Sequence, residues 1–322
     1  MTRPFIKGRP KIKLRSAEAK PTEEEAGGLY FSSEKKNYQF ISTGCTVLDC
    51  VLGGGWSLGH IANIVGDRSS GKTLLAMEAI ANLFLAYDNC WVRYVEAESA
   101  FDIDYANALG IPMDRVEMVN DLDTVEAVFE DLSNLSRKTP GLYIIDSLDA
   151  LSDEAEMGRA IGDGSFGAAK AKKLSELFRR LVRKLARQKI CVLVISQVRD
   201  NIGAMFGEKH TRSGGKALDF YASQILWLAH LKTVKRTINK IERPTGIMVR
   251  ARCKKNKISL PFRQCDFSVR FGFGIEDTEA SEEFLKTVGK SAPKTPEALR
   301  EEVIKQWYLV ERKFLPEKRK YA

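Results

Sequence analysis

Residues 66–73 read Gly66-Asp67-Arg68-Ser69-Ser70-Gly71-Lys72-Thr73, which fits the pattern G-x-x-x-x-G-K-[ST]. An apolar strand candidate, Ile61–Val65, leads into this segment, and a helical pattern that begins at Leu74 follows it. The glycines let backbone N–H groups turn inward around an anion, Lys72 can reach the β- and γ-phosphates, and the Thr73 hydroxyl can bind Mg²⁺. The helix adds the positive end of its dipole. The segment from Gly66 to Leu74 therefore predicts a site for a nucleoside triphosphate with Mg²⁺.

The composition is that of a globular protein with a basic balance. The 322 residues are 44% hydrophobic and 29% charged, which allows one large core domain with appendages, or two domains. The net charge of +9 indicates either simple solubility or a polyanionic partner, depending on where the charges lie. Six cysteines without C-x-x-C spacing, and only three histidines, argue against a zinc site and for a cytoplasmic protein with reduced thiols. No apolar run is long enough to span a membrane, so no membrane partner is expected.

Strand candidates alternate with helical patterns between about residues 40 and 275, which predicts an α/β fold with a mainly parallel sheet. We expect a basic, weakly ordered arm at 1–38, a core at 39–275, and a small helical region with a basic tail at 276–322. Two later segments predict antiparallel edge strands. The strand candidates are Ile61–Val65, Trp91–Val95, Leu142–Ile145, Cys191–Ile195 and Gln224–Leu228, the helical patterns include Thr124–Leu135 and Ala168–Arg187, and the edge strands are Gly246–Arg252 and Phe267–Phe271.

Polar side chains follow three of the parallel strand candidates, at the edge where such sheets bind ligands. Asp146 ends an apolar strand and is placed to hold Mg²⁺, with a helix-capping role as the alternative. A carboxylate beside the γ-phosphate can deprotonate an attacking water, and both Glu96 and Glu98 fit that position by spacing. Gln197, at the third strand tip, is placed to contact the γ-phosphate.

Two glycine-rich segments, 158–167 and 203–215, flank these strands, and the second is too glycine-rich and polar to form regular structure. Each combines glycines and an arginine with a large apolar side chain, which suits tracking of a nucleic-acid backbone with a group wedged between bases. Flexible surface loops are the alternative. The helix after the first loop has an apolar stripe from Leu174 to Leu185 that predicts core contact. Its remaining face is almost entirely basic, which favours a surface that contacts the phosphate backbone of a nucleic acid over a face that is only solvated.

Together these motifs resemble those of bacterial RecA-type recombinases, including phage-encoded members. The resemblance runs from Ser42 to about Gly274 and implies a RecA-like P-loop ATPase core: a mainly parallel twisted sheet flanked by helices, antiparallel edge strands and a small helical C-terminal region. Its markers are Gly66–Thr73, 96–102, Ile145-Asp146-Ser147, 202–207, 214–223 and 255–262.

The resemblance implies an ATP-dependent recombinase that forms helical filaments on single-stranded DNA, pairs it with double-stranded DNA, and hydrolyses ATP between subunits. Glu98 would be the catalytic carboxylate, Gln197 the γ-phosphate sensor, and Asp102 and Tyr105 neighbours of the adenine. Two further catalytic cations, Lys255 and Lys257, would reach the ATP of the next subunit, and Phe220 would couple that interface to the loops. The implied DNA contacts are Arg159, Phe166, Lys172, Arg179, Arg199, Ile202, Gly203, Met205, Phe206, Arg212, Ser213, Gly214 and Gly215.

Three departures from the family pattern are visible. Asp219 stands where family members often carry a lysine directed at the neighbouring phosphates, with Lys216 or Arg212 as the available substitutes. The family's N-terminal helix has no obvious counterpart, and the C-terminal tail is basic rather than acidic. Two other functions are retained as alternatives: a DNA-dependent ATPase of the same fold, such as a repair or regulatory paralogue or a hexameric motor, and a DNA-binding switch that does not hydrolyse ATP.

Overall fold

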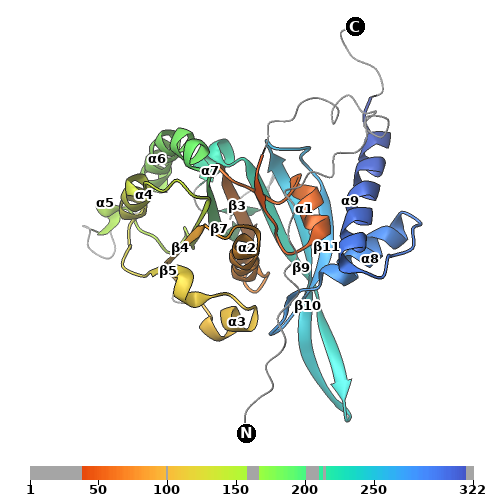
Figure 1. The fold of residues 1–322 in the computed structure, drawn as a ribbon. Helices are drawn as coiled ribbons and strands as arrows, with labels where there is room; N and C mark the ends of the chain where they lie inside the picture. The colour runs from red at the N-terminus through yellow and green to blue at the C-terminus, as the bar shows by residue number, and fades with distance from the viewer. Residues whose placement is uncertain (1–37, 99–100, 158–166, 201–209, 213–214, 317–322) are drawn as a thin grey trace.

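The computed structural model describes residues 38–98, 101–157, 167–200, 210–212 and 215–316, and centres on one mixed sheet with helices on both faces (Figure 1). Six parallel strands run in the order β9-β3-β7-β6-β4-β5, and β10, β11 and β12 continue antiparallel from β9. This arrangement confirms the predicted fold class. The strands are β1 (Phe40–Ile41), β2 (Trp56–Ser57), β3 (Ile61–Gly66), β4 (Trp91–Glu96), β5 (Val116–Val119), β6 (Gly141–Asp146), β7 (Ile190–Asp200), β8 (His210–Arg212), β9 (Gln224–Ile238), β10 (Ile241–Asn256), β11 (Gln264–Arg270) and β12 (Gly274–Ile275).

Two apolar cores lie on the two faces of the sheet because successive strand residues point to opposite faces. Ile64 and Tyr94 pack with α2 on one face, whereas Val65 and Tyr143 pack with α4 and α6 on the other. The helices are α1 (Thr46–Leu52), α2 (Lys72–Ala86), α3 (Ile103–Ala108), the 3₁₀ turn η1 (Met113–Arg115), α4 (Val125–Asn134), α5 (Glu154–Met157), α6 (Gly167–Gln188), α7 (Gly215–Tyr221), α8 (Asp277–Thr287) and α9 (Pro296–Lys313).

The predicted strands and helices are confirmed, and the apolar stripe of α6 is core contact as expected, with Leu174 and Leu185 buried. The largest difference concerns β9 and β10, which continue well past the predicted segments as a hairpin that projects from the sheet (Figure 1). Its outer residues are exposed on both faces, so its sequence lacks the alternation of apolar and polar residues that marks a half-buried strand.

The prediction that residues 203–215 are too glycine-rich and polar for regular structure is wrong for Thr211, Arg212 and Gly215. His210–Arg212 forms the short strand β8, which pairs antiparallel with the end of β7, and α7 begins at Gly215. The pairing depends on residues on both sides of a long connection, with Asp200 opposite His210. Local composition does not reveal such a non-local contact.

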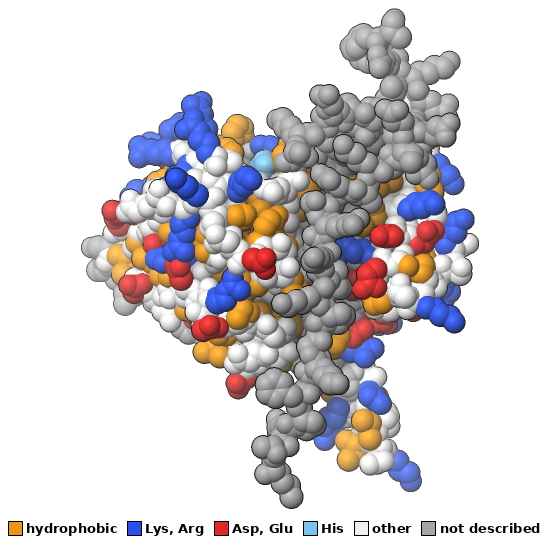
Figure 2. Space-filling model, viewed as in Figure 1, with side chains coloured by type: hydrophobic (Ala, Val, Ile, Leu, Met, Phe, Trp, Pro, Cys, Tyr) orange, Lys and Arg blue, Asp and Glu red, His pale blue; other side chains and the backbone are white. Residues whose placement is uncertain are grey.

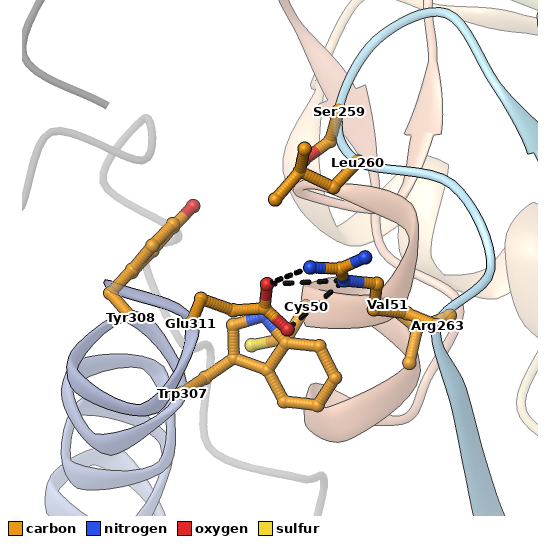
Figure 3. Close-up of a pocket in the computed structure, with 8 residues that line it drawn as sticks. All are labelled: Cys50, Val51, Ser259, Leu260, Arg263, Trp307, Tyr308 and Glu311. Carbon is orange, nitrogen blue, oxygen red and sulfur yellow. Dashed lines mark hydrogen bonds and ion pairs between the residues drawn. The ribbon is translucent and has the colours of Figure 1, made fainter. Parts of the chain in front are cut away.

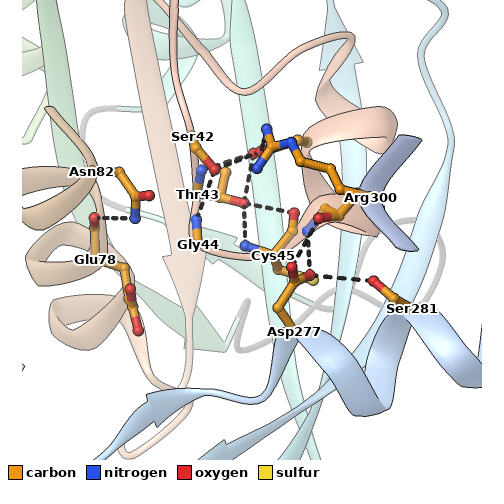
Figure 4. Close-up of polar contacts among 11 residues, drawn as sticks. Ser42, Thr43, Gly44, Cys45, Glu78, Asn82, Asp277, Ser281 and Arg300 are labelled. Carbon is orange, nitrogen blue, oxygen red and sulfur yellow. Dashed lines mark hydrogen bonds and ion pairs between the residues drawn. The ribbon is translucent and has the colours of Figure 1, made fainter. Parts of the chain in front are cut away.

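Helices α8 and α9 are attached to the core through two acids, half-buried Asp277 and buried Asp49 (Figure 4). Asp277, at the start of α8, accepts hydrogen bonds from the backbone N–H and the hydroxyl of Thr46. The carboxylate of Asp49 in α1 accepts hydrogen bonds from Ser42 and Thr43 and lies 3.2 Å from the guanidinium of Arg300 in α9. These contacts explain why helices so late in the chain pack beside α1.

A second attachment lies beside a small pocket between α9 and the connection from β10 to β11 (Figure 3). There the Arg263 guanidinium donates hydrogen bonds to both carboxylate oxygens of Glu311. The lining residues are Cys50, Val51, Ser259, Leu260, Arg263, Trp307, Tyr308 and Glu311. The proposed boundary at residue 276 stays a prediction, and the segments 1–37 and 317–322 lie outside the described residues.

Candidate nucleotide-binding site

The loop between β3 and α2 is shaped by glycines at its two ends. Gly71 caps α2 with a φ of 87°, a conformation that side chains disfavour. At Gly66 an added Cβ would come within 2.4 Å of the Ser70 hydroxyl oxygen and 3.0 Å of the Leu228 carbonyl oxygen. Inside the loop, Ser70 Oγ and Lys72 Nζ donate to the Asp67 carbonyl at 2.8 and 2.7 Å. The lysine side chain therefore lies back across the loop, at the amino end of α2.

The strand register brings the other candidate residues to the same edge. Gly66 lies opposite Gln197 on one side and Leu228 on the other, and Glu96 lies opposite Asp146. Parallel strands end at a common edge, so the phosphate loop and the polar strand tips meet there.

Asp146 is the buried acid of this edge. Its Oδ2 accepts hydrogen bonds from Thr73 Oγ1 at 2.9 Å and from the Tyr94 hydroxyl at 2.5 Å. Burial raises the pKa of Asp146, the Glu98 charge adds to this rise, and the bonds from Tyr94 and Thr73 together with the Lys72 charge oppose it. A desolvated carboxylate beside a hydroxyl oxygen is a pair of hard oxygen donors, the ligand type that Mg²⁺ prefers. Thr73 and Asp146 thus fit the predicted metal.

Glu98 has the second carboxylate of the edge. Its Oε1 accepts a hydrogen bond from Gln197 Nε2 at 2.7 Å and another from the Ser147 hydroxyl. The backbone N–H of Gln197 is itself held by Asp149 Oδ2 at 2.7 Å. The Glu98 carboxylate thus contacts Gln197, and the role of Glu98 as the base stays a prediction.

The ammonium group of Lys72 interacts electrostatically with the carboxylates of both Asp146 and Glu98. Burial lowers the pKa of Lys72, and the negative charges of Asp146, Glu98 and Asp67 oppose that change. A cation on the loop thus interacts electrostatically with two carboxylates at the same edge of the sheet. An anion with its own bound cation is the ligand that would complement this charge pattern.

Asp102 comes directly before α3 and Tyr105 lies within it, next to the connection from β11 to β12. Asp102 accepts a hydrogen bond from the Tyr105 backbone N–H and so caps α3. The Tyr105 hydroxyl donates to the Arg270 carbonyl oxygen at 3.1 Å. In the described residues both side chains have structural partners, and their expected place beside an adenine stays a prediction.

Lys255 and Lys257 meet the carboxyl end of α7. Lys255 Nζ donates to the carbonyl oxygens of Asp219 and Phe220, and Lys257 Nζ donates to that of Phe220 at 3.0 Å. The Phe220 side chain is 70% exposed beside them. The two lysines therefore lie in one cluster with Phe220, and their joint role at a subunit interface stays a prediction.

The basic face of α6 is only partly available to a ligand. Lys173 is paired with Glu126, Arg180 with Glu176, and Lys184 donates to the Ser133 carbonyl oxygen. Lys172, Arg179, Arg183 and Arg187 are exposed. The surface of α6 that could contact a DNA backbone is therefore smaller than its whole basic face.

Most of the two predicted DNA loops lies outside the described residues, including Arg159, Phe166, Ile202, Gly203, Met205, Phe206, Ser213 and Gly214. Arg199 and Arg212 lie in the paired strands β7 and β8, from which the second loop emerges. Gly215 begins α7. The DNA-contact roles of all these residues stay predictions.

Comparison with known proteins places this geometry in a family. The model of the RecA N-terminal domain matches residues 27–276. The chain belongs to the RecA family. It is 37% identical to Protein RecA of Streptomyces venezuelae over 239 residues, which are 74% of this chain and 61% of that protein. It is 34% identical to Protein RecA of Rippkaea orientalis over 272 residues, 79% of this chain and 76% of that protein.

A solved structure agrees on the fold of this RecA-family chain. The crystal structure of the RadB recombinase matches with a TM-score of 0.53 and 24% identity, over 74% of this chain and 99% of that one. This likeness supports the RecA-like α/β core alone. Among the helices of the described residues, none has both the length and the apolar character needed to cross a membrane.

Three residues of the site, Tyr94, Ser147 and Asp149, had no role assigned from the sequence. Tyr94 occupies an interior position of β4 and looks like an ordinary core aromatic, and Ser147 follows Asp146. A signal was present for Tyr94, because a buried tyrosine usually needs a partner for its hydroxyl. The acid at the end of the neighbouring strand was available as that partner.

Proposed function

We propose that this RecA-family chain is an ATP-dependent recombinase that assembles on single-stranded DNA and exchanges strands with a homologous duplex. The observation that carries the proposal is that the loop lysine Lys72 shares one edge of the sheet with the Thr73–Asp146 pair and the Glu98–Gln197 pair, and that both carboxylates act on its charge. A nucleotide switch without hydrolysis has no need of a carboxylate held beside the phosphate loop. The arrangement therefore favours an ATPase.

Each side chain would have a separate task. Thr73 and Asp146 would hold Mg²⁺, which when bound neutralises phosphate charge. Lys72 and the backbone N–H groups of the loop would hold the phosphates. Glu98 would orient a water and take its proton, with Ser147 and Gln197 fixing the carboxylate through the hydrogen bonds that they donate to it.

Gln197 links hydrolysis to DNA. Its amide contacts Glu98, and the strand that holds it, β7, continues into the predicted second DNA loop. A γ-phosphate that drew the amide away from Glu98 would move the end of this strand. ATP would then favour the DNA-binding state, and hydrolysis would release it.

Assembly would complete the site. Lys255 and Lys257 would supply cations to the ATP of the next subunit, so hydrolysis would require a filament. Heterologous contacts of this kind generate an open helix. A DNA-dependent ATPase of the same fold without strand exchange is the second candidate, favoured by Asp219 at a position where lysine is frequent in the family.

The proposal is tested by ATPase assays with and without single-stranded DNA, electron microscopy of the same samples, and strand exchange between homologous substrates. We expect DNA-stimulated turnover, filaments and exchange. Stimulated turnover without filaments or exchange would support the second candidate, and no turnover under any condition would overturn the ATPase assignment.

Two matched variants test the base. Glu98→Gln should still bind ATP and DNA but hydrolyse ATP at least about a hundredfold more slowly, which is the lower end of general-base contributions. Glu96→Gln removes the same charge from the end of β4 and should have far less effect. Equal turnover in Glu98→Gln and the wild type would remove Glu98 from the mechanism.

A further inference from the structure

The turn after β10 carries one buried amide between two lysines. Lys255 and Lys257 both donate to the Phe220 carbonyl oxygen, at 3.0 Å each, so their side chains share one side of the turn. Asn256, the last residue of β10, lies between them, and its side chain is only 8% exposed. The function proposed above uses the two ammonium groups and gives this amide no role.

Positive charge alone does not distinguish these two lysines. Figure 2 shows Lys and Arg side chains at many separate places on one face of the molecule. A cation that acts on the nucleotide of another subunit must also be placed accurately, because a misplacement of about 1 Å can cost about a hundredfold in rate. The contacts that fix the backbone of these lysines therefore matter as much as their charge.

The oxygen of the Asn256 amide closes the turn. Its Oδ1 accepts hydrogen bonds from the backbone N–H groups of Ile258 at 2.8 Å and of Ser259 at 3.0 Å. An asparagine that accepts from the backbone two residues further on forms an Asx turn. The backbone N–H of Lys257 donates to the Ser223 carbonyl oxygen at 2.8 Å. Residues 255–259, which we call the lysine turn, are thus fixed through their backbone.

The nitrogen of the same amide connects the lysine turn to α1. Asn256 Nδ2 donates at 3.0 Å to the carbonyl oxygen of Leu52, the last residue of α1. Carbonyl groups at the end of a helix lack partners within the helix, and the negative end of the helix dipole favours a donor there. The next residue, Gly53, permits the approach, because an added Cβ would lie 2.3 Å from the Ser259 Cβ. The lysine turn therefore packs directly against the end of α1.

Helix α1 is a fixed support for this turn. Its first residue, Thr46, donates from its backbone and its hydroxyl to Asp277. Gln224 lies opposite Asn256 in the pairing of β9 with β10 and donates to the same Leu52 carbonyl oxygen at 3.1 Å. Two buried amides thus join the end of α1 to the sheet, and of these two Asn256 is the one that also binds the lysine turn.

We infer that Asn256 is a positioning residue for Lys255 and Lys257, because it fixes the lysine turn against α1. The lysine side chains can then exchange the carbonyl oxygens at the end of α7 for the phosphates of a neighbouring subunit's ATP without a movement of the backbone. A flexible lysine side chain can change its partner, but only a fixed backbone limits where its ammonium group arrives. This inference deepens the proposed function, on which it rests.

Two variants that remove the same number of buried hydrogen bonds separate positioning from stability. Asn256→Ala removes one bond to α1 and two bonds within the lysine turn. The control Gln224→Met keeps the volume of the side chain and removes three bonds to α1 and to residues 55–57, none of which involves the lysine turn. Asn256→Ser is the conservative variant, because a hydroxyl can close the same kind of turn more weakly.

We expect Asn256→Ala and Gln224→Met both to unfold at lower urea concentration than the wild type, because each leaves buried polar groups without partners. Binding of ATP to the single protomer without DNA should stay near wild type in both. The DNA-stimulated kcat of Asn256→Ala should fall at least about tenfold with KM for ATP little changed, because cations from the neighbour act on charge that develops in the transition state. Gln224→Met should keep its kcat, and Asn256→Ser should recover part of it.

Mixed filaments give a result that a purely structural role would not produce. Asn256→Ala subunits keep Glu98, and Glu98→Gln subunits keep a positioned lysine turn, so some interfaces of a mixed filament combine the two intact halves. At equal amounts about a quarter of the head-to-tail interfaces are of this kind. Turnover of the mixture should therefore reach about a quarter of the wild-type value, although each variant alone is slow.

Three outcomes would overturn the inference. Wild-type turnover in Asn256→Ala would show that the amide does not position the lysines. An equal loss of kcat in Gln224→Met would reduce the effect to stability. A mixture no faster than its two components would place the defect in the nucleotide site of the Asn256→Ala subunit itself. A wild type that forms no filaments and shows no DNA-stimulated ATPase would instead remove the proposed function, whatever the variants do.

Discussion

Tyr94→Phe isolates one hydrogen bond to the buried acid of the site. The side chain of Tyr94 is fully buried and its hydroxyl donates at 2.5 Å to Asp146, so phenylalanine keeps the packing and removes only the donor. A hydrogen bond to a charged group contributes about 1.5–3 kcal/mol. Thr73 still donates to the same oxygen, so the acid keeps one partner. We therefore expect a loss near the lower end, about 1.5–2 kcal/mol of unfolding free energy at neutral pH.

The loss should depend on pH in a defined direction. Burial raises the pKa of Asp146 above its ordinary 3.8, so the ionised acid costs stability and the fold gains stability as pH falls through the raised pKa. Without the Tyr94 hydroxyl that pKa rises further. The loss of unfolding free energy in Tyr94→Phe should therefore be largest above the pKa of Asp146 and should become smaller as the pH falls toward 3.8. The acid limb of the ATPase profile should move to higher pH, because protonated Asp146 no longer holds the metal.

Tyr143→Phe is the matched control. Tyr143 is also fully buried in the sheet, and its hydroxyl donates at 2.8 Å to Asp131, which is paired with Arg93 away from the phosphate loop. Urea unfolding should show a similar loss in both variants, and only Tyr94→Phe should move the ATPase profile. The reasoning is refuted if Tyr94→Phe unfolds like the wild type, or if both variants move the profile equally.

Three further perturbations test other parts of the structure. Arg300→Ala leaves the buried Asp49 carboxylate without its cation and should cost about 2 kcal/mol in urea unfolding, because the arginine is partly exposed; an unchanged midpoint would contradict this. When the folded protein is treated with a thiol-alkylating reagent at pH 8, half-buried Cys90 should react before Cys191, because burial raises the pKa of Cys191 to about 12. Peptide mapping of the labelled protein gives the order of reaction. Arg179→Ala should lower the salt slope of single-stranded DNA binding by about one, and an identical slope would remove exposed Arg179 from the footprint.

The sequence predicts the centre of this fold well because the parallel strands are buried on both faces. Segments such as Leu142–Ile145 are continuous apolar runs, and each ends in the polar residue that reaches the site. The phosphate loop, Asp146 and Gln197 could therefore be placed at one edge before any coordinates were known. The register of the strands, with Gly66 opposite Gln197, brings them together as expected.

Features that depend on distant partners were not predictable in this way. The hairpin beyond Leu228 is solvated on both sides, so neither a periodic pattern nor an apolar run marks its length. Spacing left the choice between Glu98 and Glu96 open, and only the resemblance assigned Glu98. The contact of Glu98 with Gln197, and that of Tyr94 with the acid that ends the neighbouring strand, depend on positions in space. The spacing of residues along the chain does not reveal the distance from Gln197 to Glu98 or the distance from Tyr94 to Asp146.

The contact of Lys255 and Lys257 with the end of α7 has a consequence for assembly. In the single chain these ammonium groups are already engaged by the carbonyl oxygens of Asp219 and Phe220. If a neighbouring subunit's nucleotide is their partner in a filament, every new interface must first replace these internal bonds. The isolated protomer would then compete with its own polymer, and growth would begin only above a threshold concentration. Nucleotide or DNA that lowered this threshold would determine when, and on what template, polymerisation starts.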